Sequence, residues 1–297
     1  MIDIGWFGVG SGALADAEGV AQVAAAAEEL GYESVWVGEH PVLIDPQVGP
    51  SPLPPHSEML DPVAVLAYAA ARTTRVKLGT GIVILPLRNP VILAKQLASV
   101  DVLAQGRLLV GVGVGYVPGE YEAVGVPFGT RGRRADDYID AMRSLWDDDE
   151  PRFSGEFAAF SGVQSRPQPA SPRLALYASG MATAALRRAV SRADGWYGFF
   201  QDLDSTKRSL DELARLADEV ERPAVLGELR ITITPPPGVI DRDTVNRFED
   251  LGVHRLVLLH DFMDMAGGPD PARRDLFLAD METTADRLGL SSGGDRD

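Results

Sequence analysis

Glu39 and His40 stand side by side at the end of a short apolar run, SVWVGEHPV, and both side chains can move protons. A histidine titrates near neutral pH, so an imidazole beside a carboxylate can serve as a general acid or base. Successive strand residues point to opposite sides, so we expect only one of the two to face a binding site. The alternative is structural, with His40 at a strand end bonded to a loop.

Two glycine-rich segments follow further apolar runs. Thr80, Gly81 and Ile82 lie in VKLGTGIVILPLRNP, and Gly113 and Gly115 lie in GRLLVGVGVGY. Glycine inside a buried strand often marks the close approach of a ligand, although a bulge that helps to close a sheet explains it equally well. The second segment lacks the dinucleotide fingerprint, because its glycines do not open directly into a helix.

A serine–glycine turn stands where another apolar run meets a predicted helix, in LALYASGMATAALRRAV. Ser179, Gly180 and Met181 lead into that helix, whose first turn would offer free backbone N–H groups and the positive end of the helix dipole. These groups bind phosphate. An ordinary serine cap of the helix is an equally good interpretation.

Short apolar runs alternate with longer amphipathic stretches along the whole chain. These runs and stretches are the elements that could position the residues named above. This alternation predicts βαβ units and a parallel sheet. Pro62 and Pro90 suit the first turns of helices, where a missing N–H has no helical partner. The predicted strands are Ile2–Phe7, Ser34–Val37, Val76–Ile82, Leu108–Gly113, Leu174–Ala178, Gly195–Phe199, Arg230–Thr234 and Arg255–His260. The predicted helices are Asp16–Leu30, Pro62–Thr73, Pro90–Ala104, Arg131–Trp146, Ala182–Ala193, Ser205–Val220, Asp243–Leu251 and Arg273–Leu288.

Equal numbers of strands and helices favour a closed barrel over an open sheet. We therefore predict an α/β fold, a single (β/α)8 TIM barrel over residues 1–290, followed by a disordered tail at 291–297. Long irregular segments are expected at 41–61, 114–130 and 147–173, and the last contains FSGEFAAFSGV, which is typical of a β-hairpin. The first two follow strand ends, so we expect insertions at the C-terminal face, where barrel active sites lie.

Composition excludes several classes of function. Asp and Glu number 43 against 28 Lys and Arg, and a net charge of −15 argues against nucleic acid or an anionic membrane surface as a partner. The absence of cysteine excludes disulfides and thiolate chemistry, and four histidines without helical pairing predict no metal site. The chain lacks a basic apolar leader and a long apolar run, so we expect a cytoplasmic protein without a membrane span.

Taken together, these segments resemble the luciferase-like monooxygenase family, particularly its actinobacterial branch that uses the deazaflavin F420. The resemblance extends from GYESVWVGEH through KLGTGIVILPLRNP and GRLLVGVGVGY to LYASG and RADGWYGF, which is nearly the whole chain. It implies an oxidoreductase that transfers a hydride between coenzyme F420 and an unidentified small organic substrate. The alternative that it leaves open is an FMN-dependent monooxygenase that uses reduced flavin and oxygen.

The resemblance also implies roles for particular residues. It places a non-prolyl cis peptide at Gly81-Ile82, against which the cofactor ring would lie. It makes His40 a cofactor contact and the candidate catalytic acid or base, although F420-dependent relatives often carry Asp where this chain has Glu39. It assigns phosphate binding to the turn from Tyr177 to Met181. The implied cofactor-binding set is Glu39, His40, Thr80, Gly81, Ile82, Gly113, Gly115, Tyr116, Glu120, Tyr177, Ala178, Ser179, Gly180 and Met181.

Two hypotheses of other classes stay open. A non-catalytic flavin-binding barrel would have a blocked or absent substrate cavity. A lyase or aldolase would need a lysine or a metal at the barrel mouth, whereas Lys77, Lys95 and Lys207 all lie away from predicted strand ends. The resemblance implies a homodimer and, as a further partner, a separate reductase that regenerates the reduced cofactor. The irregular segments are rich in proline and aromatic residues, which favours a moderately hydrophobic substrate.

Overall fold

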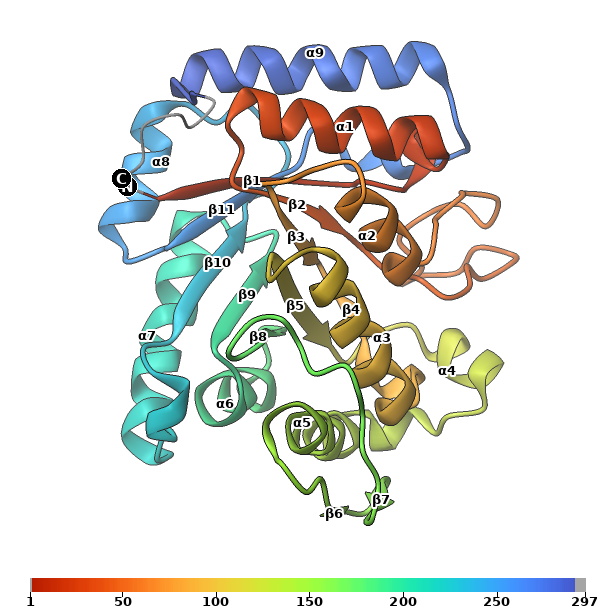
Figure 1. The fold of residues 1–297 in the computed structure, drawn as a ribbon. Coiled ribbons are helices and arrows are strands. Elements are labelled where there is room, and N and C mark those ends of the chain that lie inside the picture. Colours follow the sequence, from red (N-terminus) through yellow and green to blue (C-terminus); the bar gives the residue numbers. More distant parts are fainter. Residues whose placement is uncertain (1, 292–297) are drawn as a thin grey trace.

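A computed structural model describes residues 2–291 and contains a barrel of parallel strands, shown in Figure 1. The expected disordered tail, apart from Ser291, lies outside the described residues. The barrel strands are β1 (Asp3–Phe7), β2 (Ser34–Val37), β3 (Lys77–Thr80), β4 (Val83–Ile84), β5 (Leu108–Gly113), β8 (Ala175–Ser179), β9 (Gly195–Phe199), β10 (Arg230–Thr234) and β11 (Arg255–Leu258).

The strands pair in the order β3-β2-β1-β11-β10-β9-β8-β5, and β3 also pairs with β5, which closes the ring. The closed eight-stranded barrel predicted from the sequence is therefore confirmed. The predicted bounds of β2, β5, β9 and β10 are those observed. The predicted strand Val76–Ile82 is wrong at its end: the ladder is interrupted at Gly81-Ile82 and resumes as β4, which also pairs with β5.

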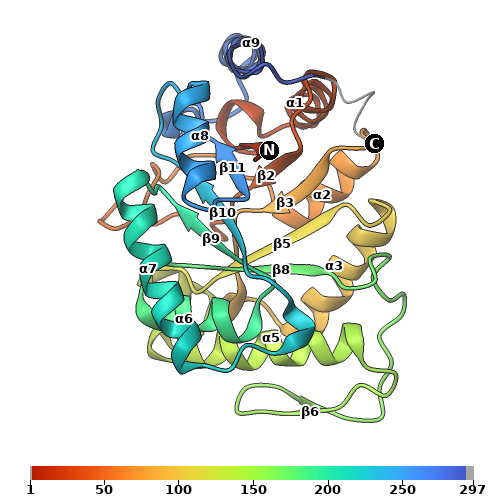
Figure 2. The same cartoon turned by 90° about the vertical axis from the view of Figure 1, so that its left-hand side faces the viewer.

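Helices surround the barrel, and Figures 1 and 2 both show α1 and α9 together over one flank and α5 over the opposite flank. Pro62 and Pro90 occupy first-turn positions, as predicted, and the side chains of Asp61 and Asn89 cap the same two helices. The helices are α1 (Ala17–Leu30), α2 (Pro62–Ala70), α3 (Pro90–Leu103), α4 (Pro118–Val124), α5 (Arg131–Asp147), α6 (Thr183–Arg192), α7 (Leu203–Glu219), α8 (Arg242–Asp250) and α9 (Pro271–Leu288).

Helix α4 corrects the prediction that residues 114–130 form a long irregular segment. Pro118 stands at the start of this helix, and Gly125 ends it with a φ of 77°, in the left-handed region that suits glycine. Both residues are ordinary helix-end signals. They were missed because the dipeptide Pro118-Gly119 is also typical of a turn.

The predicted hairpin in the segment 147–173 is confirmed as the antiparallel pair β6 (Phe153–Ser154) and β7 (Ala159–Phe160). Helix α2 and strand β11 also end two or three residues earlier than expected. Helix α2 stops at Ala70, before the predicted end at Thr73, and β11 stops at Leu258, before His260. These shorter ends lengthen the connections that follow them.

Two apolar layers hold the fold together. The larger lies between the strands and the helices, and the smaller fills the barrel with side chains such as Trp36, Tyr177 and Tyr197. Arg255, at the start of β11, closes the N-terminal end of the interior, where it pairs with Glu33. Because this end is filled and paired, the space for a ligand lies at the opposite end, where the strands finish.

Candidate active site

A cavity of about 640 Å³ opens at the C-terminal ends of the strands. Its size falls within the range that small-molecule and cofactor sites occupy. Four strand ends and the segments after them contribute the predicted part of its lining. The predicted residues that the fold brings together there are Glu39, His40, Gly81, Ile82, Gly113, Gly115, Tyr116, Ser179, Gly180 and Met181.

Four other predicted residues lie behind the lining. Thr80 is buried, and its hydroxyl bonds to the backbone of Gly111, so it joins neighbouring strands. Tyr177 lies inside the barrel, where its hydroxyl is 3.3 Å from Nη1 of Arg255. Ala178 is buried among strands and helices. Glu120, the fourth, supports a residue that does line the cavity.

His40 and Glu120 form a pair at the cavity wall. Nδ1 of His40 lies 2.9 Å from Oε1 of Glu120, whose side chain is only 1% exposed. With the carboxylate ionised, Nδ1–H donates to it, and this bond fixes the imidazole tautomer so that Nε2 is available to a bound molecule. The second carboxylate oxygen, Oε2 of Glu120, is buried and has no partner among the described residues. The pair can therefore hold or release a proton at a fixed position.

Tyr116 borders this pair. The Tyr116 and His40 ring centroids are 6.1 Å apart in an edge-to-face arrangement. Burial and the negative charge of Glu120 raise the pKa of Tyr116, so its hydroxyl stays protonated at neutral pH. Tyr116 is therefore a hydrogen-bond donor beside the imidazole.

Glu39 has a different environment from that of its neighbour. It accepts hydrogen bonds from the guanidinium of Arg88 and from the backbone N–H of Ile84, and Arg88 also pairs with Asp61. Burial lowers the pKa of Arg88, but the two carboxylates outweigh this effect and raise it, so the guanidinium stays charged. Glu39 thus ties the end of β2 to the segments around it, which leaves His40 as the candidate group for proton transfer.

Close packing of the cavity wall leaves little room for a side chain at Gly81 and Gly113. A Cβ at Gly81 would lie 2.7 Å from the Phe7 ring, and one at Gly113 would lie 2.7 Å from Cδ1 of Ile82. The peptide between Gly81 and Ile82 is cis, as the resemblance implied. The side chain of Ile82 lies at the cavity surface, against the glycine-rich end of β5.

The turn after β8 leads into α6 without a side-chain cap. Ser179 ends the strand, and the cap position is Ala182, so the alternative in which the serine caps the helix does not apply. The Gly180 carbonyl accepts a hydrogen bond from Nε1 of Trp196 at 3.0 Å. The first-turn N–H groups of α6 therefore have no side-chain acceptor of their own, which suits an anion such as phosphate.

The remaining lining residues were not predicted from the sequence. Most of them come from β1, from the segment after β2, from β9 and its end, and from the segment after β11, and only barrel closure brings these together. The sequence offered one signal for such residues, which was their position at or just after the end of a predicted strand. This signal applied to Phe199 and Phe200. The most prominent of these residues are Phe7, Leu53, Met59, Phe199, Phe200, Phe262 and Met265.

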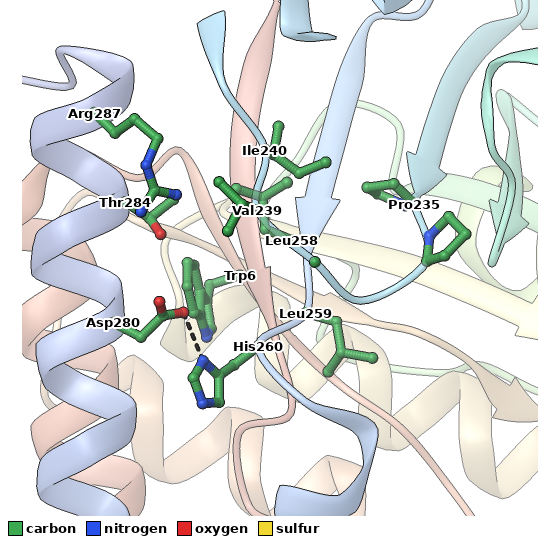
Figure 3. A pocket seen from close by; sticks show the side chains of 12 residues that line it. Trp6, Pro235, Val239, Ile240, Leu258, Leu259, His260, Asp280, Thr284 and Arg287 are labelled. Atoms are coloured by element: carbon green, nitrogen blue, oxygen red, sulfur yellow. Dashed lines mark ion pairs between the residues drawn. The ribbon is translucent and has the colours of Figure 1, made fainter.

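A smaller hollow of about 190 Å³ lies on the outside of the barrel, between α9 and the segment after β10 (Figure 3). Its polar side chains include His260 and Asp280, with Nδ1 of His260 at 2.7 Å from Oδ2 of Asp280. The residues that line this hollow are not those that the strand ends bring together at the larger cavity. We therefore take the larger cavity as the candidate active site.

Within residues 2–291, no cluster of three or more His, Asp or Glu is placed to bind a metal ion. No helix among these residues is both long and apolar enough to cross a membrane. Lys77 lies at the start of β3, away from the cavity, and pairs with Glu33 at 2.8 Å.

The fold and the position of the cavity define a TIM-barrel protein of the kind that binds its ligand at the strand ends. A family model described as luciferase-like monooxygenase matches residues 5–257. An uncharacterized protein of Mycobacterium tuberculosis is 32% identical over 250 residues, which cover 79% of this chain and 85% of that protein. The chain belongs to the luciferase-like monooxygenase family.

Two further similarities concern proteins with named cofactors. An FMNH(2)-dependent dimethylsulfone monooxygenase of Pseudomonas putida is 30% identical over 160 residues, 52% of this chain and 42% of that protein. The solved structure of an F420-dependent secondary alcohol dehydrogenase, in complex with an F420-acetone adduct, matches with a TM-score of 0.75 at 18% identity. That match covers 100% of this chain and 99% of the other, and it concerns the fold.

Proposed function

We propose that this protein is an oxidoreductase that transfers a hydride between coenzyme F420 and a small organic substrate. The observation that carries the proposal is the His40–Glu120 pair at the wall of a large cavity, with Nδ1 and Oε1 at 2.9 Å. A hydride carrier needs a partner that takes up or supplies the accompanying proton. His40 would take that role, and Glu120 would position it.

The residues of the cavity fit a phosphate-bearing deazaflavin or flavin. The uncapped first turn of α6, beside Ser179 and Gly180, would hold the phosphate. The ring would lie against Ile82 and the glycine-rich end of β5 at Gly113, where the absence of side chains leaves room. When bound, F420 would supply hydride exchange at C5 of its ring.

The chain's own residues would perform the remaining tasks. Nε2 of His40 would take the proton from a substrate hydroxyl during oxidation, or return it to a carbonyl oxygen during reduction. Glu120 would stabilise the imidazolium that forms, because its carboxylate already accepts from Nδ1. The apolar side chains around the cavity would exclude water, which strengthens these electrostatic interactions.

An FMN-dependent monooxygenase is the second candidate, and the similarity to the dimethylsulfone monooxygenase favours it. Nearly the same residues would hold FMN. The other classes have less support. The open cavity argues against a non-catalytic barrel, and the position of Lys77 leaves a lyase mechanism without its lysine.

Titration of the purified protein with F420 and with FMN, followed by ring fluorescence, would test this proposal. We expect micromolar binding of F420 and much weaker binding of FMN. The reverse order would support the monooxygenase, and binding of neither cofactor would overturn both candidates. Riboflavin, which lacks the phosphate, is the matched control, and we expect it to bind at least tenfold more weakly than FMN if α6 holds a phosphate.

The proposal includes a homodimer and a separate reductase that regenerates the reduced cofactor. Helix α3 carries Ile92 and Leu103 at its surface, 58% and 61% exposed. Large exposed apolar side chains on one helix favour association with a second protein surface. Light scattering of the purified protein gives the molar mass that decides between one chain and two.

A further inference from the structure

One side of the cavity is built from apolar side chains that are not among the proposed cofactor-binding residues. They come from the segment after β2, from the end of β9 with the residue after it, and from the segment after β11. The proposed cofactor residues come from the first residues after β2, from the β3–β4 break and from the ends of β5 and β8 with the residues that follow them. We call this opposite side the apolar wall, and it comprises Leu53, Met59, Phe199, Phe200, Phe262 and Met265.

Aromatic rings form a continuous surface along the apolar wall. The ring centroids of Phe199 and Phe200 are 4.3 Å apart, and those of Phe200 and Phe262 are 5.6 Å apart. Phe7 extends the row, at 5.2 Å from Phe199. Rings at these spacings present flat apolar faces and edges, which suit an aryl or branched alkyl group.

Phe200 holds an unusual conformation at this surface. Its φ is 54°, in the left-handed region that is unfavourable for a residue with a Cβ, and its side chain remains 39% exposed. Backbone outliers of this kind cluster at ligand sites. A glycine would adopt this backbone conformation more easily. The presence of phenylalanine at this position therefore indicates a role for its ring in binding.

The charge of the cavity restricts what can bind beside the apolar wall. Within the described part of the chain, the cavity lining contains neither lysine nor arginine, and its buried carboxylate, Glu39, is already bound to Arg88. A carboxylate or phosphate on the substrate would lose water without gaining a cationic partner. The lining therefore disfavours charged substrates, apart from a phosphate on the cofactor at α6.

We infer that the substrate is an uncharged alcohol or carbonyl compound that carries an aryl or branched alkyl group, which packs on the apolar wall. This inference rests on the proposed function for its reaction. In 1-phenylethanol, for example, the C–H bond at the hydroxyl-bearing carbon would break with its electron pair. The hydride would pass to oxidised F420 and the hydroxyl proton to Nε2 of His40, giving acetophenone.

Equilibrium dialysis with acetophenone and with 4-acetylbenzoate tests the inference by binding alone. These probes share the ketone and the ring, and they differ by one carboxylate. In the presence of the cofactor that binds, we expect acetophenone to bind at least tenfold more tightly. Equal binding, or tighter binding of 4-acetylbenzoate, would overturn the inference.

Variants of the apolar wall make the test specific. Phe200→Gly and Phe262→Ala should each weaken acetophenone binding about tenfold, while Leu276→Ala, at an exposed site on α9, should leave it unchanged. Met59→Lys adds the missing cation and should reverse the preference toward 4-acetylbenzoate. Unchanged binding in Phe200→Gly, together with no reversal in folded Met59→Lys, would also overturn the inference.

Failure of this inference is distinguishable from failure of the proposed function. If neither F420 nor FMN binds in the titration, the proposed function fails whatever dialysis shows. If a cofactor binds but acetophenone has no advantage over 4-acetylbenzoate, the proposed function stands and the apolar substrate class is wrong. Circular dichroism of each variant confirms that a loss of binding does not come from unfolding.

Discussion

His40 and Glu120 lie 80 positions apart in the sequence, and the barrel brings their side chains within 2.9 Å of each other. Each residue alone has an ordinary structural explanation. Their contact at a cavity wall, with a buried and otherwise unpaired carboxylate oxygen, is harder to explain by packing, because such an atom costs free energy to bury. The pair is therefore the strongest indication of chemistry in the molecule.

Removing the imidazole separates proton transfer from binding. His40→Asn should lower kcat by about 10²- to 10⁴-fold, the usual contribution of a general acid or base, with a smaller effect on KM. Glu120→Gln keeps a hydrogen-bond acceptor for Nδ1 but removes the charge that stabilises an imidazolium, so we expect a loss of about tenfold in kcat. Steady-state kinetics with whichever cofactor binds measures both effects.

His56→Asn is a matched control, because His56 is an exposed histidine that does not line the cavity. It should keep the kcat of the unaltered protein. A His40→Asn enzyme with full kcat and a raised KM would show that His40 only binds, and the proton would then have to come from elsewhere.

At the scale of elements, the helix–strand order could be predicted from the sequence because periodicity and helix caps are local signals. The apolar wall could not be predicted, because Leu53, Phe200 and Phe262 belong to three separate connections. The role of Arg88 was missed for the same reason, since its partners Glu39 and Asp61 lie on other segments. Even α4 was missed where a local helix signal competed with a local turn signal.

Connections between elements also carry stability. The carboxylate of Glu28, in the last turns of α1, accepts the backbone N–H groups of Thr74, Arg75 and Val76, just before β3. Burial raises the pKa of this carboxyl, but the three N–H groups outweigh burial and lower it to about 2. The folded state therefore favours the ionised form more strongly than the unfolded chain does.

The consequence for stability follows from the direction of this shift. Because the folded pKa lies below the ordinary value of 4.5, the contribution is present above pH 4.5 and is lost as the pH falls toward 2. Glu28→Gln should lower the free energy of unfolding by about 1 kcal/mol at pH 7, after allowance for solvent screening. Urea unfolding should show this difference at pH 7 and a smaller one at pH 3.

Glu29→Gln alters the neighbouring exposed carboxylate and provides the comparison. It should stay within about 0.5 kcal/mol of the unaltered protein at both pH values. Equal effects of the two substitutions at pH 7 would show that the hydrogen bonds from the N–H groups near β3 to Glu28 do not stabilise the folded state.

Considered as a whole molecule, the barrel has a filled end and an open end. At the filled end, Nε and Nη2 of Arg255 each lie 2.8 Å from an oxygen of Glu33, in a bidentate pair. The guanidinium is 2% exposed and lies over the rings of Trp36 and Tyr177. Because β2, β1 and β11 are neighbours, this pair spans the place where the first and last strands of the barrel meet.

Breaking this pair should destabilise the whole barrel. Burial raises the pKa of Glu33, but Arg255 and Lys77 outweigh it and lower the pKa to about 2, so both members of the pair are charged at neutral pH. Glu33→Gln removes the closer counter-charge of a buried cation and leaves Asp3, whose Oδ2 lies 3.7 Å from Nη2 of Arg255. Breaking comparable pairs costs about 3–5 kcal/mol, and we expect a loss toward the lower end of this range. Guanidinium unfolding at pH 7 should show this loss, while Lys77→Met, at a more exposed partner, should cost less than about 1 kcal/mol.

Substitutions at the two ends of the barrel should affect different properties. At the filled end they should lower stability, and at the open end they should weaken binding. Glu33→Gln acts below the cavity, so the fraction that remains folded should bind the cofactor with an unchanged Kd. Phe200→Gly acts at the mouth and should weaken substrate binding while the free energy of unfolding stays the same or rises, because glycine adopts a φ of 54° without strain. A Glu33→Gln protein with normal stability but weakened cofactor binding would contradict this division, and it would make the Arg255 pair part of the site.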